Sequence, residues 1–122
     1  MMNADNAVPA GWTAFFWAAS IFNLLIGLAG MVSPEATIDA RIVGLLVFAF
    51  GVIYFLVARD PLRFAPVLWA GVLGKLGVVA LLAPEAFGEG GDRLIAGILS
   101  LDVMFALGFM AFLFTRGEDS TA

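Results

Sequence analysis

Four long apolar runs alternate with short polar stretches along the chain. They cover about residues 12–32, 41–58, 67–83 and 94–115. A helix rises about 1.5 Å per residue, so runs of this length can cross a hydrocarbon core of roughly 30 Å. The pattern predicts an all-α fold: an integral membrane four-helix bundle that fills the chain, residues 1–122, as a single transmembrane domain.

Prolines and charges separate these runs. Ser-Pro-Glu-Ala at 33–36 follows the first, a stretch with two prolines and three charges at 59–66 follows the second, and Pro-Glu-Ala at 84–86 follows the third. Proline removes a backbone donor and clashes with the preceding turn, so each stretch favours a helix end. Because the connections are short, we expect an up-down-up-down order with both termini on one side.

A motif recurs between the two halves. Ser-Pro-Glu-Ala precedes Arg41, and Ala-Pro-Glu-Ala at 83–86 precedes Arg93; each arginine opens an apolar run with an early glycine, Gly44 or Gly97. One interpretation is a duplication that made two repeated helical hairpins, related by an axis along the membrane normal. The alternative is that Pro-Glu commonly stops a helix and arginine commonly lies at a helix edge.

Composition strengthens the membrane prediction. Hydrophobic residues make up 62% of the chain and charged residues 13%, whereas soluble domains average about half and a quarter. The mean hydropathy is +1.03. A water-soluble chain of 122 residues cannot bury so much apolar surface, whereas a bilayer accepts it.

The distribution of arginines indicates how the chain is oriented across the membrane. Arg59, Arg63 and Arg116 fall on the side of the termini, and Arg41 and Arg93 fall on the other. The positive-inside rule then predicts a multi-pass membrane protein with cytoplasmic termini. A signal peptide is the competing interpretation of the first run, but no lysine or arginine precedes that run. The net charge of −4, without a basic cluster, suggests no nucleic-acid partner.

Missing residue types narrow the chemistry. The chain has no cysteine and no histidine, so thiolate sites, disulfides and histidine-based metal or triad chemistry are excluded. We expect no metal, no cofactor and no catalytic residue, and we favour a role other than that of an enzyme.

One lysine, Lys75, lies near the middle of the third run. An ammonium at that depth costs about 2.5 to 3.5 kcal/mol on insertion scales, so it needs a partner. Asp102 is the carboxylate inside another apolar run. Lys75 lies eight residues before Ala83 and Asp102 eight residues after Leu94. Both are therefore about 12 Å from the same face, and we expect them to form an ion pair.

Asn23 and Arg41 are the other candidate site residues. Asn23 lies nine residues before Val32, so we expect it to join Lys75 and Asp102 in one buried polar layer. Its alternative role is a simple interhelical hydrogen bond. Arg41 is shallower, at the edge of that layer, and can turn inward toward Asp102 or Asp39.

Small residues lie on the same helices, and small residues permit close backbone contact where lipid gives no hydrophobic force between helices. They are Ser20, Gly27 and Gly30 in the first run, Gly44 and Gly51 in the second, Gly71 and Gly74 in the third, and Gly97 and Gly108 in the fourth.

Three functions fit these features. The first is an accessory or binding protein for a hydrophobic ligand or a larger membrane partner. The second is a small transporter or proton-coupled carrier that uses the same pair, as an oligomer because four helices enclose little cavity. The third, an enzyme acting on lipid or quinone, ranks last because one carboxylate and one lysine are a thin acid/base set. The pair also has a purely structural interpretation, which is to set helix register. Homo-oligomerisation is left open.

The chain resembles the DoxX-like and related families of small bacterial four-helix membrane proteins. The similar features are Asn23 with Gly27 and Gly30, Pro34, the Arg41 to Gly44 opening, Arg-Asp-Pro at 59–61, Gly74 with Lys75, and Asp102. The resemblance implies a membrane protein of mostly unassigned role, sometimes an accessory subunit of a redox or assembly system. It transfers no catalytic residue.

Overall fold

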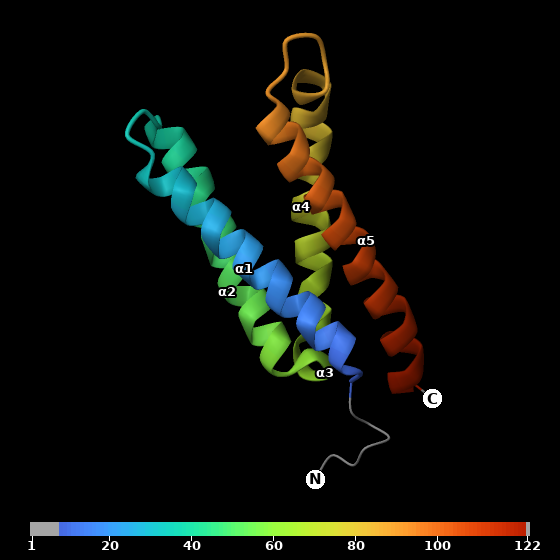
Figure 1. The fold of residues 1–122 in the computed structure, drawn as a ribbon. Helices are drawn as coiled ribbons and strands as arrows, with labels where there is room; N and C mark the ends of the chain where they lie inside the picture. The colour runs from blue at the N-terminus through green and yellow to red at the C-terminus, as the bar shows by residue number, and fades with distance from the viewer. Residues whose placement is uncertain (1–7, 122) are drawn as a thin grey trace. The chain divides into compact units, whose positions relative to one another are not determined.

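The structure is a computed structural model that describes residues 8–121, with side chains described for residues 8–115. Within that part of the chain every regular element is helical (Figure 1). The elements are α1 (Ala10–Val32), α2 (Ile38–Arg59), α3 (Pro61–Phe64), the 3₁₀ turn η2 (Ala65–Val67), α4 (Leu68–Ala86) and α5 (Arg93–Thr121). The all-α prediction is confirmed.

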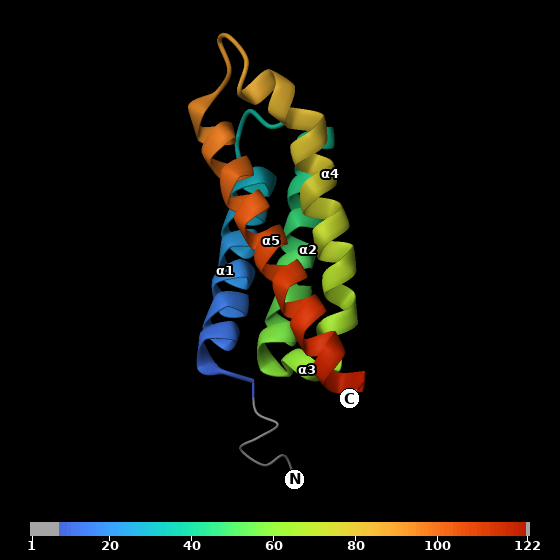
Figure 2. The same cartoon turned by 90° about the vertical axis from the view of Figure 1, so that its right-hand side faces the viewer.

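The chain divides into two compact units between Ala65 and Pro66. The first contains the hairpin of α1 and α2, and the second contains the hairpin of α4 and α5. Figures 1 and 2 show the two helices of each hairpin side by side, joined by a short connection at one end. The up-down-up-down order of all four helices stays a prediction.

Caps explain why the first hairpin begins and ends where it does. The backbone N–H of Ser33 donates to the carbonyl of Ala29 and closes α1, and Pro34 then prevents another turn. The hydroxyl of Thr37 accepts from the N–H of Ala40 at 3.1 Å, which is a helix N-cap. α2 therefore starts at Ile38, before the predicted start at residue 41.

The connection at 59–66 is more helical than the sequence suggested. α2 does end at Arg59, because Asp60 leaves the helical region with φ −152° and ψ 76°. The residue before a proline is biased toward this extended region. Pro61 then opens α3, since the first position of a helix needs no backbone donor. The charged stretch thus forms a short helical turn.

The second hairpin also departs from the predicted ends. α4 continues through Pro84 to Ala86, so this proline lies in the last turn of the helix and does not end it. The carboxylate of Asp92 accepts from the N–H of Leu94 at 2.8 Å and caps the start of α5. α5 runs to Thr121, past the predicted end at residue 115, and the residues beyond that point include no proline to stop it.

Backbone contact holds the first hairpin together, as the small residues predicted. A side-chain carbon added at Gly44 would lie 2.8 Å from the carbonyl oxygen of Gly27 and 2.8 Å from the nitrogen of Met31. At Gly51 the same atom would lie 2.9 Å from the nitrogen of Leu24. The hydroxyl of Ser20 also donates to the carbonyl of Gly51 at 2.8 Å. α1 and α2 therefore approach closely along one glycine-lined face.

The predicted repeat has unequal halves. Pro34 follows the end of α1, whereas Pro84 lies inside α4. A carbon added at Gly44 would meet the backbone of α1, whereas one added at Gly97 meets nothing within 4 Å. The two hairpins thus share the motif. Its proline lies at a different position relative to the helix end in each hairpin, and its glycine contacts the neighbouring helix in the first hairpin only. Duplication stays a hypothesis.

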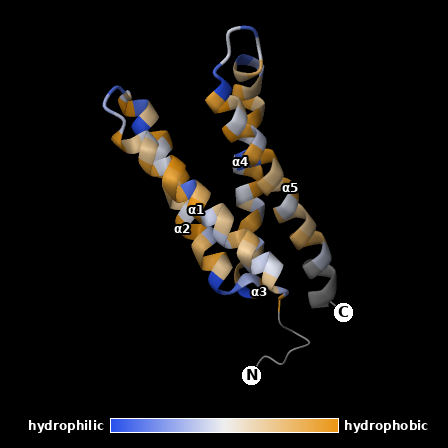
Figure 3. Cartoon of the chain, viewed as in Figure 1, coloured by the Kyte–Doolittle hydropathy of each residue, from blue (hydrophilic) through white to orange (hydrophobic). Residues whose placement is uncertain are grey.

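Within the described residues, four helical segments are long and apolar enough to cross a membrane: Ala10–Val32, Ile38–Arg59, Pro61–Ala86 and Arg93–Thr115. Figure 3 shows hydrophobic colour along these helices and hydrophilic colour at the loops that connect them within each hairpin. The segments are compatible with a multi-pass membrane protein, as the sequence predicted.

Candidate functional site

The predicted ion pair is present between α4 and α5. The Nζ atom of Lys75 lies 2.7 Å from the Oδ1 atom of Asp102, which is both a salt bridge and a hydrogen bond. The Lys75 side chain is 5% exposed and the Asp102 side chain 13%. The two charges, predicted at one depth from residue counts alone, therefore meet in a nearly buried position.

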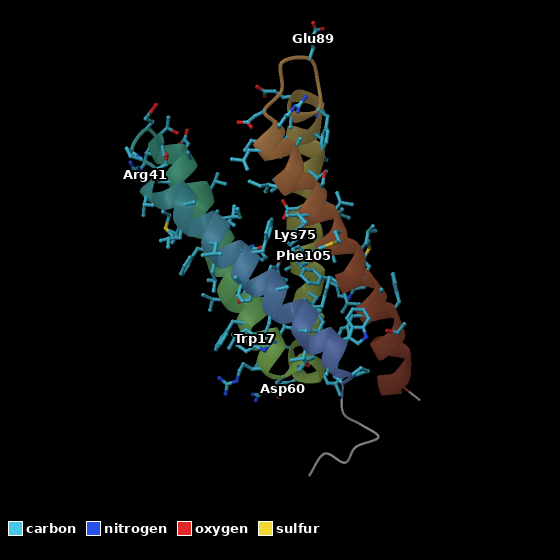
Figure 4. The ribbon with its side chains drawn as sticks, in the orientation of Figure 1. Trp17, Arg41, Asp60, Lys75, Glu89 and Phe105 are labelled. Carbon is cyan, nitrogen blue, oxygen red and sulfur yellow. The ribbon has the colours of Figure 1, made fainter. Side chains whose placement is uncertain are left out.

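An aromatic ring also lies near the lysine. Its Nζ atom lies 5.5 Å from the ring centroid of Phe105, within the range of a cation–π contact (Figure 4). Phe105 follows Asp102 by three residues, so one face of α5 presents both the carboxylate and the ring to the lysine. The ammonium thus has an acidic partner and an aromatic one from the same helix.

The pair is neutral as a unit, which explains how apolar helices can hold it. Burying either charge alone is expensive, whereas a well-formed hydrogen-bonded pair recovers much of the desolvation cost. Leu99, on α5, is 2% exposed, and Val72, on α4, is 6% exposed. The ion pair therefore lies on helix faces that also bury apolar side chains.

Asn23 has an interhelical partner in its own hairpin. Its Nδ2 atom donates to the carbonyl of Val47 on α2 at 3.1 Å, and the residue is 5% exposed. This is the simple interhelical hydrogen bond that was one of its two predicted roles. A polar layer that joins Asn23 to Lys75 and Asp102 stays a prediction.

Arg41 has carbonyl partners instead of the suggested carboxylates. Its guanidinium donates to the carbonyl of Met31 and, at 3.1 Å, to the carbonyl of Ser33. The last carbonyls of a helix have no partner within that helix and carry its negative dipole end, so a cation is favoured there. Arg41 thereby ties the start of α2 to the end of α1, and Figure 4 shows it at the loop end of this hairpin.

Comparisons with protein families, with curated proteins and with solved structures find no match. The resemblance to DoxX-like proteins therefore stays a prediction, and so does any role for the ion pair.

Carboxylates outside the pair gather near the loop of the second hairpin. Glu85 and Asp92 line a shallow hollow there together with Gly90 and Gly91. The carboxylate of Asp92 is engaged in capping α5. Across the described part of the chain, no group of three or more acidic side chains is arranged to hold a metal ion.

The sequence did not single out every residue of this site. Phe105 was not among the candidate site residues, although its three-residue spacing from Asp102 is a usable signal. The sequence could not indicate which carbonyls accept the hydrogen bonds of Ser20, Asn23 and Arg41, because every residue carries a carbonyl. Helix packing alone decides which carbonyl each side chain reaches.

Proposed function

We propose that this chain is a small integral membrane accessory or binding protein, built around the ion pair of Lys75 and Asp102. Its ligand is a hydrophobic molecule or a larger membrane partner. The supporting observation is a neutralised pair, nearly buried between two helices that are long and mostly apolar. Ionisable groups at membrane depth are functional candidates, since retaining them is costly.

The outward surface of the second hairpin supports a bilayer as its surroundings. Large apolar side chains are strongly exposed there, including Leu73 at 76%, Leu81 at 81% and Leu94 at 71%. Such surface is unfavourable in water and favourable against lipid tails. We propose that the membrane is the bacterial inner membrane, as the resemblance suggests, with the loops at 33–37 and 87–92 on one side and, by the positive-inside rule, the termini in the cytoplasm.

This topology predicts a labelling pattern. The chain has no cysteine, so each single-cysteine variant reports one position without background. In oriented vesicles, a membrane-impermeant maleimide is expected to label Glu35→Cys and Glu89→Cys from one side and Asp60→Cys from the other. Leu101→Cys, in the middle of a span, is the control and is expected to stay unlabelled. Labelling of all four from one side would contradict the topology.

Binding is favoured over catalysis because the site offers little acid/base chemistry. Its one amine and one carboxylate already engage each other at 2.7 Å. General acid–base catalysis needs groups within reach of a reacting atom and with suitable proton affinity. A neutral pair beside an aromatic ring suits the recognition of a ligand better than the transfer of protons.

Native mass spectrometry from mild detergent tests the binding role. The wild-type protein is expected to retain a lipid-like molecule or a membrane partner across several lipid extracts. Repeated isolation of a bare protein would contradict the proposal.

Proton flux in liposomes distinguishes the transporter alternative from the binding role. That alternative requires flux that is lost in both Lys75→Ala and Asp102→Asn. Under the binding role, the reconstituted wild-type protein and the two variants are expected to give the same background flux. Flux above background that disappears in both variants would favour a carrier and contradict the binding role.

A further inference from the structure

The ion pair uses only one of the two carboxylate oxygens of Asp102. The Nζ atom of Lys75 contacts Oδ1. Among the residues whose side chains the structure describes, none donates a hydrogen bond to Oδ2. A carboxylate offers about four acceptor sites, so most of the accepting capacity of Asp102 remains open. Buried polar atoms normally have partners, which makes this oxygen a place to look for one.

Asp102 is also the more accessible member of the pair. Its side chain is 13% exposed against 5% for Lys75. The lysine is further enclosed by Phe105, whose ring centroid lies 5.5 Å from Nζ. More of the Asp102 side chain than of the Lys75 side chain is thus open to a molecule that reaches the pair, and the carboxylate of Asp102 is an acceptor.

Charge restricts what such a molecule can be. An anion would face the carboxylate at low dielectric, where like charges repel strongly. A cation would leave a net positive charge among apolar helices, which is costly without a further counter-ion. A neutral hydrogen-bond donor keeps the unit neutral and satisfies the open oxygen. A hydroxyl group is the simplest donor of this kind.

The depth of Asp102 along α5 restricts the class of ligand further. Asp102 lies nine residues after Arg93, where α5 begins, and is therefore roughly 14 Å along the helix. The charged headgroups of phospholipids lie in the polar interfacial regions outside the hydrocarbon core. The donor must instead belong to a mostly apolar molecule that can bring a hydroxyl below the interface.

We propose that Oδ2 of Asp102 accepts a hydrogen bond from the hydroxyl of a neutral, long-chain amphiphile bound against the hairpin of α4 and α5. This inference rests on the proposed binding function and names its ligand class. Lys75 acts as a positioning residue, because it holds the carboxylate through Oδ1 and leaves Oδ2 for the ligand.

The test uses two photoactivatable probes that differ only at the head. One is a diazirine-bearing octadecanol, and the other is its methyl ether, which cannot donate. In proteoliposomes of the wild-type chain, the alcohol is expected to label peptides of α4 and α5 about tenfold more than the ether does. That ratio is of the size that one hydrogen bond to a charged acceptor gives.

Two variants locate the effect. Lys75→Met with Asp102→Leu removes the pair while leaving apolar side chains in its place, and it is expected to abolish the preference for the alcohol. Ser100→Ala is the matched control. Ser100 lies two residues from Asp102 and is exposed, but its hydroxyl already donates to the carbonyl of Ala96 at 2.9 Å. The Ser100→Ala variant is expected to keep the full preference.

The outcomes separate this inference from the proposed function. Equal labelling of the wild-type protein by alcohol and ether overturns the hydroxyl inference, whether or not the double variant folds, and leaves a binding role for a purely apolar ligand. A preference for the alcohol that persists in the double variant also overturns it, because the hydroxyl is then recognised elsewhere. Absence of saturable labelling by both probes overturns it as well. In that case native mass spectrometry decides the binding role independently.

Discussion

Gly44→Ala is expected to lower the free energy of unfolding of the first hairpin by about 2 to 3 kcal/mol, a large effect for one added methyl group. The new carbon would lie 2.8 Å from the oxygen of Gly27 and 2.8 Å from the nitrogen of Met31. Both are backbone atoms, which cannot turn away as a flexible side chain can. α1 and α2 must therefore move apart, and the hydrogen bond from Asn23 to the carbonyl of Val47 would lengthen.

Gly97→Ala is the matched control for this change. It makes the same substitution in α5, where an added carbon meets nothing within 4 Å. Because alanine loses less conformational freedom in a helix than glycine does, stability is expected to stay the same or rise by up to about 1 kcal/mol. Unfolding in mixed detergent micelles, followed by circular dichroism, measures both variants. Equal losses from both would contradict the glycine-lined contact.

Lys75→Met alone is expected to destabilise the protein by about 3 to 5 kcal/mol, because it leaves the carboxylate of Asp102 nearly buried without its partner. Asp102→Leu alone is expected to have a similar cost for the reverse reason. Together, the two substitutions replace a neutral pair by apolar side chains of comparable size. We expect the double variant to recover most of the loss, since such replacements are often close to neutral.

A double-mutant cycle on the same unfolding assay measures the coupling between the two residues. Asp39→Leu serves as the control, because Asp39 is exposed in the first turn of α2 and its loss is expected to cost less than about 1 kcal/mol. Costs that simply add in the double variant would contradict the coupling. If the double variant is stable and still retains its ligand or partner, the pair is structural.

The ion pair was predictable because its requirements are simple. A lysine in a long apolar run needs a counter-charge, Asp102 was the carboxylate in another such run, and equal counts from the shared loop put both at one depth. A helix has a fixed rise, so residue number converts directly into position along it. Their observed separation of 2.7 Å confirms that argument.

Helix ends were less predictable, because capping residues and helix-breaking residues both influence where a helix begins and ends. Thr37 capped α2 earlier than the apolar run suggested, and Pro84 was tolerated in the last turn of α4. At the start of α2 the deciding contact is a single side-chain hydrogen bond, from the N–H of Ala40 to the hydroxyl of Thr37. Hydrophobic pattern alone does not register such a bond.

The sequence by itself determined that the protein is helical, that four of its segments are apolar enough to span a membrane, and that Lys75 needed a counter-charge, for which Asp102 was the best candidate. These properties depend on composition, on helical rise and on the cost of an isolated charge. Only the tertiary structure decided that Gly44 touches the backbone of α1 while Gly97 touches nothing. It also decided that Arg41 binds carbonyls and that Asp102 keeps one oxygen open toward the described residues. These outcomes depend on how each helix is rotated about its axis and how closely its neighbour approaches, and the spacing of residues along one chain does not specify either quantity.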